Sequence, residues 1–149
     1  MKVLSPRAHA PIDYLLVALF GLAPTLFGFE GIASLISYVL AVGVMMTSLL
    51  TRYPLGVFKV IPFPVHGYIE LAAAPLLIAM PFLFGFEERE IARNFFMATG
   101  AAYAVVWLIT DYKAAETDVR RRGVARGFDR SAIDRTDIDG PHIGKRPMF

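Results

Sequence analysis

The stretch HAPIDYLLVALFGLAPTLFGFE, residues 9–30, returns as HGYIELAAAPLLIAMPFLFGFE, residues 66–87. Each copy opens with a histidine, carries a carboxylate four residues later and ends on Leu-Phe-Gly-Phe-Glu, and the copies are 66 − 9 = 57 residues apart. Each is an apolar run of the length that a membrane-spanning helix needs, about 20 residues for a hydrocarbon core of about 30 Å. The repeat therefore predicts two equivalent membrane spans.

A second apolar run follows each copy after a short glycine-containing turn. These runs are GIASLISYVLAVGVMMTSLL and IARNFFMATGAAYAVVWLIT. We predict an all-α protein with four transmembrane helices arranged as two helical hairpins, repeat 1 over about residues 9–53 and repeat 2 over about 66–112. Hairpins of the same direction make a parallel repeat, related by a pseudo-twofold axis along the membrane normal. The bundle then covers residues 1–112.

Small and polar residues in the second spans continue the repeat at the same offset. Ser37 pairs with Asn94 (94 − 37 = 57) and Gly43 with Gly100 (100 − 43 = 57), whereas LLTRY (49–53) matches LITDY (108–112) only after a two-residue slip. Small residues let helices approach closely in lipid. The predicted packing positions are therefore Ser37, Asn94, Gly43 and Gly100, with Pro24 and Pro81 at bends of the first spans.

Composition and charge agree with a membrane protein of defined orientation. The chain is 56% hydrophobic with a mean hydropathy of +0.52, and it has no cysteine, which excludes disulfides and thiol catalysis. Of 15 Lys and Arg residues, only Arg89 and Arg93 lie in the short turns, so 15 − 2 = 13 lie on the other side. The positive-inside rule predicts that both termini are cytoplasmic, with the protein in the cytoplasmic (inner) membrane.

The duplicated hairpin, the proline before each Leu-Phe-Gly-Phe, and the linking segment YPLGVFKVIPFPVHGYIEL resemble the SPW-repeat family of small bacterial membrane proteins. The resemblance covers roughly residues 9–112. The family is named after a Ser-Pro-Trp motif, where this chain has Ala23-Pro24-Thr25 and Met80-Pro81-Phe82. The resemblance implies a four-span membrane protein and no established activity.

The histidine–carboxylate pairs His9/Asp13 and His66/Glu70 are the candidate functional residues. Members of each pair are four residues apart and so share a helix face near the cytoplasmic end. The four side chains could bind one divalent metal ion, His9 and His66 could ligate a haem, or the set could relay protons. The preferred interpretation is that each pair only anchors its own helix start, too far from the other pair to share an ion. On this interpretation the protein binds no metal or cofactor.

Residues 113–149 form a polar tail with nine basic and six acidic residues. Such a segment buries no core alone and is expected to be extended or disordered until a partner orders it. Arg120, Arg121, Arg122 and Arg126 are predicted to dock on anionic lipid or on a partner, and nucleic-acid binding is not expected.

No nucleotide fingerprint or catalytic triad is present. The sequence therefore favours a non-enzymatic accessory or scaffold subunit of a larger membrane complex, with its tail docking at the cytoplasmic face. Its partners would be membrane lipids and other integral membrane proteins. The alternatives are a small transporter or proton- or ion-conducting protein using Asp13 and Glu70, or a metal- or haem-binding membrane protein using His9 and His66.

Overall fold

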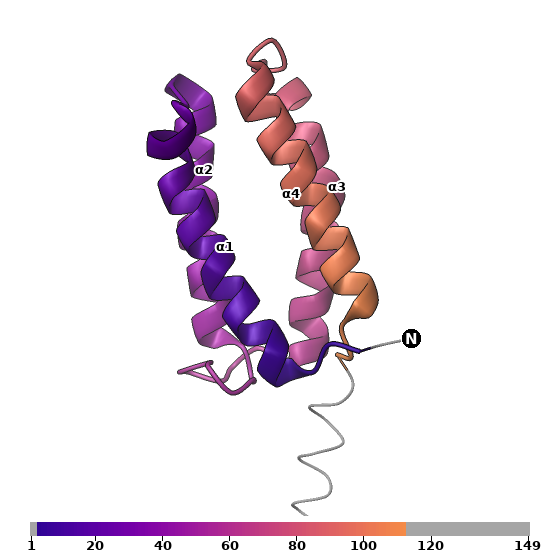
Figure 1. The fold of residues 1–149 in the computed structure, drawn as a ribbon. Coiled ribbons are helices and arrows are strands. Elements are labelled where there is room, and N and C mark those ends of the chain that lie inside the picture. Colours follow the sequence, from indigo (N-terminus) through magenta and orange to yellow (C-terminus); the bar gives the residue numbers. More distant parts are fainter. Residues whose placement is uncertain (1–2, 113–149) are drawn as a thin grey trace, which may run out of the picture. The chain divides into compact units, whose positions relative to one another are not determined.

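The computed structural model describes residues 3–112. This part of the chain contains four α-helices: α1 (Pro6–Phe27), α2 (Gly31–Leu50), α3 (Phe63–Leu83) and α4 (Glu90–Ile109) (Figure 1). The helices are 22, 20, 21 and 20 residues long, and each is apolar enough to cross a membrane. The prediction of an all-α protein with four spans is confirmed, and no β-strand occurs among the described residues.

Local sequence fixes where α1 begins and ends. Ser5 precedes the helix in an extended conformation, and its Oγ accepts the backbone N–H of Ala8 at 3.4 Å. Pro6 follows in the first turn, where its missing N–H removes no helical hydrogen bond. The helix ends at Gly28, whose φ of 67° lies in the left-handed region that glycine adopts without steric cost.

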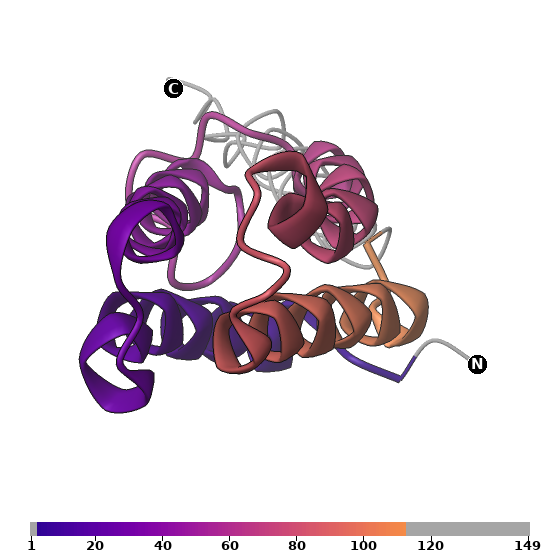
Figure 2. The same ribbon diagram turned by 90° about the horizontal axis from the view of Figure 1, so that it is seen from above.

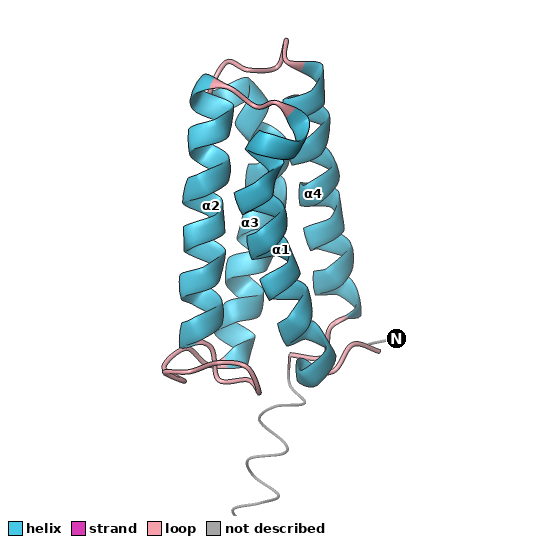
Figure 3. Ribbon diagram, turned by 60° about the vertical axis from the view of Figure 1, so that its left-hand side comes forward, coloured by secondary structure: helices cyan, strands magenta, loops and turns pink. Residues whose placement is uncertain are grey.

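The helices pack in sequential pairs, α1 mainly against α2 and α3 mainly against α4. The two pairs lie side by side in perpendicular views (Figures 1 and 2). The two short helix–helix turns lie at one end of the helices, and the connection 51–62 and the N-terminal segment lie at the other (Figure 3). Buried apolar side chains between the helices include Phe20, Leu77 and Phe96.

Backbone hydrogen bonds tie the start of each pair to the end of the other. The N–H of Asp111, after α4, donates to the carbonyl of Leu4 at 2.9 Å. The N–H of Arg52, after α2, donates to the carbonyl of Ile61 at 2.8 Å. The four residues correspond by the repeat, since 61 − 4 = 57 and 111 − 52 = 59. This reciprocal pairing is what two hairpins related by a pseudo-twofold axis require.

The structure corrects the register of the second spans. The first helices are offset by 63 − 6 = 57 residues, but α2 and α4 are offset by 90 − 31 = 59 at their starts and 109 − 50 = 59 at their ends. The two extra residues lie in the second turn, so the slip seen at LLTRY and LITDY already holds along the whole helix. The pairing of second-span residues at an offset of 57 is therefore wrong.

This shift explains which predicted packing residues are buried. Ser37 is buried and donates to the carbonyl of Phe20 at 2.7 Å, and its equivalent at 37 + 59 = 96 is the buried Phe96. Asn94 is exposed, and its side chain accepts from Arg93. The packing prediction for Asn94 is therefore wrong within this chain.

The two glycines of the predicted packing seam also differ. A Cβ on Gly100 would lie 2.7 Å from the carbonyl oxygen of Ala74, so α4 lies against α3 at this glycine. Gly43 is exposed with no atom near its Cβ position, and the prediction for it is wrong. In repeat 1 the residue equivalent to Gly100 is Ala41, because 41 + 59 = 100. Ala41 is partly buried and packs against the apolar core. Pro24 and Pro81 lie inside α1 and α3 and are buried.

These two glycines make a matched pair of variants. Gly100→Ala is expected to lower the free energy of unfolding by about 1–3 kcal/mol, because the added methyl group overpacks the contact with α3. Gly43→Ala is expected to raise it by about 0.5–1 kcal/mol, because alanine is the better helix former and nothing lies in its way. Thermal unfolding in mild detergent measures both, and equal shifts in the two variants would contradict the revised register.

Candidate functional site

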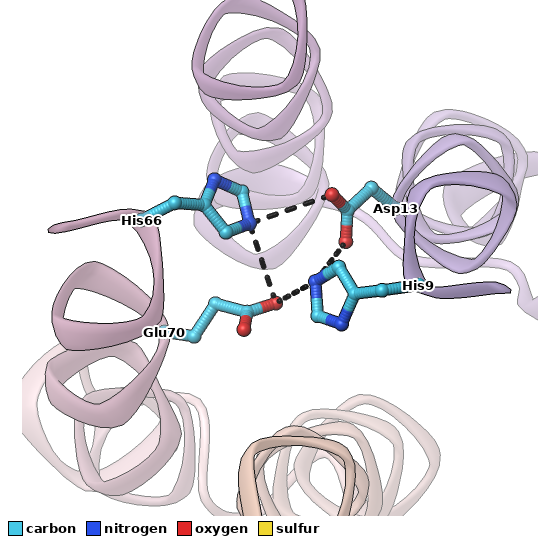
Figure 4. Close-up of side chains that lie close together, drawn as sticks. All are labelled: His9, Asp13, His66 and Glu70. Carbon is cyan, nitrogen blue, oxygen red and sulfur yellow. Dashed lines mark ion pairs between the residues drawn. The ribbon is translucent and has the colours of Figure 1, made fainter. Parts of the chain in front are cut away.

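Four ionisable side chains meet where α1 and α3 begin (Figure 4). The Nε2 atom of His9 lies 3.2 Å from Asp13 Oδ1 and 3.2 Å from Glu70 Oε1. The Nε2 atom of His66 lies 3.4 Å from Asp13 Oδ2 and 3.6 Å from Glu70 Oε1. Histidine and carboxylate thus alternate around a ring. We call these four residues the quartet.

The quartet is almost completely removed from solvent. The exposed fractions are 0% for His9, 1% for Asp13, 2% for His66 and 5% for Glu70. One ligand atom from each residue can be chosen so that all lie within 4.8 Å of one another. The prediction that each pair stays at its own helix start, too far from the other to share an ion, is wrong. The i, i+4 spacing leaves open which way each helix turns this face, and both helices turn it inward.

Threonine hydroxyls hold the two imidazole rings. The hydroxyl of Thr110 donates to the carbonyl of Val106 at 2.6 Å, so its oxygen accepts the Nδ1–H of His9, 3.1 Å away. In the same way, Thr51 donates to the carbonyl of Thr47 at 2.6 Å and accepts from His66 Nδ1 at 2.9 Å. Each ring therefore carries a proton on Nδ1 and turns Nε2 toward the quartet. Each threonine follows the second helix of the other pair, so the rings are held across the two pairs.

Tyrosine hydroxyls hold the two carboxylates. Tyr53 donates to Asp13 Oδ2 at 2.9 Å, and Tyr112 donates to Glu70 Oε2. Both tyrosines are buried, and burial raises the pKa of each phenol well above its usual range, with the negative quartet adding to the effect. The phenols are therefore neutral hydrogen-bond donors at every physiological pH.

The two halves of the site differ at two positions, in the length of the carboxylate side chain and at the residue that follows the histidine. Glu70 is one methylene longer than Asp13, and the glycine at position 67 stands where repeat 1 has Ala10. A Cβ on Gly67 would lie 2.7 Å from the ring of Tyr112. The missing side chain therefore lets Tyr112 lie directly against α3, where it reaches the Glu70 carboxylate.

The two Nε2 atoms are the unusual feature of the site. Both are buried, and neither makes a hydrogen bond, although carboxylate oxygens lie 3.2–3.6 Å away. Each ring nitrogen points between oxygens and at none of them. When it carries no proton, an Nε2 directed between carboxylate oxygens presents a lone pair that is suited to a bound cation. This observation is independent of the residue types in the quartet.

Among the alternatives left open by the sequence, haem does not fit this geometry. The rings of His9 and His66 are nearly perpendicular, at 86°, with centroids 5.6 Å apart. Carboxylate oxygens lie beside both Nε2 atoms, and Phe63 packs against both rings, with centroids 5.3 and 6.1 Å away. These contacts leave no slot for a porphyrin between the two histidines.

The four residues of the quartet could be singled out from the sequence, but the residues around them could not. Thr51, Tyr53, Thr110 and Tyr112 lie in the LLTRY and LITDY segments, which the sequence marks only as part of the repeat. The signal for a role was the recurrence of the same two polar residues, two positions apart, at the end of each repeat. The predicted docking residues Arg120, Arg121, Arg122 and Arg126 lie outside the described residues.

Comparisons of the chain with protein-family models, with curated proteins and with solved structures find no match. The resemblance to the SPW-repeat family therefore stays a prediction.

Proposed function

We propose that this integral membrane protein binds one divalent transition-metal ion in the quartet and that zinc is the ion it takes. The observation that carries the proposal is the pair of buried Nε2 atoms, without hydrogen-bond partners, pointing between two carboxylates. These nitrogens form ion pairs with the carboxylates at 3.2–3.6 Å but no well-aligned hydrogen bond, and a metal ion bound by both would supply the missing directed contact.

The distances suit a tetrahedral site. Ligand atoms 2.0–2.1 Å from a zinc ion are about 3.3–3.4 Å from one another at tetrahedral angles. The four nitrogen–oxygen distances in the quartet are 3.2, 3.2, 3.4 and 3.6 Å. These distances involve both oxygens of Asp13, and one ligand atom from each residue can be chosen so that all four lie within 4.8 Å of one another. The side chains would therefore move closer together to receive an ion.

Charge and ligand type narrow the choice of ion. Two carboxylates carry two negative charges, which a divalent cation neutralises in a site where isolated charges are costly. Imidazole nitrogen suits zinc and its neighbours, whereas magnesium and calcium prefer oxygen alone. Two imidazoles held by Nδ1 hydrogen bonds also follow the usual outer arrangement of histidine ligands to zinc.

Four protein ligands make a closed site, which is typical of structural rather than catalytic zinc. Two ligands come from α1 and two from α3. These helices belong to different helix pairs, so the ion would hold the two pairs together. This favours a non-enzymatic role over the transport alternative. It agrees with the predicted accessory or scaffold subunit that packs beside other membrane proteins.

Orientation is proposed from charge. Arg7, Arg52 and Lys59 lie at the end of the helices that holds the quartet, and Arg89 and Arg93 at the other. Both termini would then face the cytoplasm in the inner membrane, with the metal site near the cytoplasmic surface.

A cysteine-labelling experiment tests this orientation, and the natural chain has no cysteine to interfere. Val57→Cys and Glu88→Cys place exposed thiols at opposite ends of the bundle. An impermeant maleimide added to intact cells is expected to label only the Glu88→Cys protein, and disrupting the cells should expose Val57→Cys. Labelling of Val57→Cys from outside would reverse the proposed orientation.

Metal binding is tested by titrating the metal-stripped protein, purified without a polyhistidine tag, with Zn²⁺ in a calorimeter. One ion per chain is expected to bind, and an excess of Mg²⁺ should not displace it. His66→Gln keeps a polar side chain of similar size and is expected to lose the binding heat. A wild-type protein that binds no Zn²⁺, or a His66→Gln variant that binds equally well, would overturn the proposal.

A further inference from the structure

We propose that Tyr53 and Tyr112 set the metal selectivity of the site by holding each carboxylate to coordination through a single oxygen. The inference rests on the proposed function, because it assigns these tyrosines to the quartet's metal site. They are positioning residues, acting through Asp13 and Glu70 rather than touching the ion.

The two oxygens of Glu70 have different surroundings. Oε1 faces both histidines, 3.2 Å from His9 Nε2 and 3.6 Å from His66 Nε2, while Oε2 accepts the phenol of Tyr112. A hydrogen bond from a neutral phenol occupies Oε2 and turns it away from the centre. Glu70 therefore presents one oxygen to an ion.

Asp13 is divided in a similar way. Oδ1 lies 3.2 Å from His9 Nε2 and has no phenol on it, whereas Oδ2 accepts from Tyr53 at 2.9 Å. Oδ2 also lies 3.4 Å from His66 Nε2, so both oxygens of Asp13 face the quartet and Tyr53 engages the one beside His66. With Oδ2 engaged by Tyr53, Asp13 would bind an ion through Oδ1, the oxygen that accepts no phenol.

The number of oxygens offered decides which ion fits. Two imidazoles and two single-oxygen carboxylates give four ligands, the number that zinc prefers. If both carboxylates bound through both oxygens, the same residues would give six ligands, which suits manganese. The two phenols would therefore favour a four-coordinate ion over a six-coordinate one.

Packing holds the two tyrosine rings in place, so that each hydroxyl stays on its carboxylate oxygen. Both rings pack on Phe63, with centroid distances of 5.9 Å for Tyr53 and 4.9 Å for Tyr112, and Tyr112 also lies against Gly67. Fixed rings keep the hydroxyls on the same carboxylate oxygens, which is how outer contacts orient metal ligands.

The test uses Co²⁺ as the probe in tag-free protein, because four-coordinate Co²⁺ absorbs visible light far more strongly than six-coordinate Co²⁺. Tyr53→Phe and Tyr112→Phe, singly and together, keep the rings and remove the phenols. Tyr14→Phe is the matched control, since Tyr14 donates to the backbone carbonyl of Leu55 at the same end of the bundle and not to a carboxylate. Competition between Zn²⁺ and Mn²⁺ is measured on wild type and on the same four variants.

Wild type and Tyr14→Phe are expected to give the strong four-coordinate spectrum. In the Tyr53→Phe and Tyr112→Phe proteins the Co²⁺ absorption should weaken. Their preference for Zn²⁺ over Mn²⁺ should fall by about 10–100-fold, the usual effect of removing an outer contact. Gained Mn²⁺ binding is a result that misfolding does not produce. If wild type is four-coordinate and the variants match it in spectrum and preference, the tyrosine proposal fails and the proposed function stands. If wild type binds no Co²⁺ and no Zn²⁺, the proposed function itself fails.

Discussion

Replacing Asp13 with asparagine and Glu70 with glutamine in one chain is expected to abolish metal binding. Both side chains keep nearly the same shape, but the two negative charges that neutralise the ion are lost. An amide oxygen is also a weaker ligand than a carboxylate for a transition metal. The loss of affinity should exceed the roughly 10–100-fold that removal of an outer contact produces. Calorimetric titration with Zn²⁺ measures the effect.

The single variants distinguish a shared site from two separate anchors. In a shared site either Asp13→Asn or Glu70→Gln should remove most of the binding. Glu88→Gln removes an exposed carboxylate at the opposite end and serves as the control, with unchanged binding expected. If the carboxylates only anchor their own helix starts, the two variants should give small, additive losses of stability and no change in bound metal. That result would contradict the shared site.

Removing the metal is expected to destabilise the wild-type protein strongly. An ion that binds only the folded state contributes about 4.1 kcal/mol when its free concentration is 1,000 times the dissociation constant. The contribution acts between the hairpin pairs, because His9 and His66 lie on α1 and α3. A strong chelator should therefore lower the unfolding temperature, and Zn²⁺ added in excess should restore it.

The Asp13→Asn/Glu70→Gln protein is the control for chelation. Its unfolding temperature should already be low, and neither chelator nor Zn²⁺ should change it. A chelator effect of equal size in both proteins would mean that the chelator acts elsewhere. No effect in wild type, under conditions where the metal is shown to leave, would contradict a structural role for the ion.

The spans and the quartet's residues could be predicted from the sequence, because apolar length and residue spacing determine both. The arrangement of the quartet could not, since its closure depends on how α1 and α3 turn about their own axes. The register of α2 against α4 was missed because alanine and glycine recur often enough to match at 57 as well as at 59. Asn94 shows the consequence: it is exposed, and the residue equivalent to Ser37 is Phe96.

The residues around the quartet were missed for a related reason. Tyr53 and Tyr112 are aromatic residues at the ends of spans, where tyrosine is common in membrane proteins without any site. Thr51 and Thr110 reach the histidines of the opposite hairpin pair, 15 and 101 residues away in sequence. Contacts of this kind follow from how the two pairs dock, and no local pattern encodes them.

The most direct test of the account is the metal content of the protein as cells make it. Protein without a polyhistidine tag is purified from membranes in mild detergent, with no added metal or chelator. Its metal content is then measured by inductively coupled plasma mass spectrometry. One zinc ion per chain is expected in wild type and in Glu88→Gln, and none in Asp13→Asn/Glu70→Gln. Wild-type protein that is folded and free of transition metal, or metal retained in the double variant, would contradict this expectation.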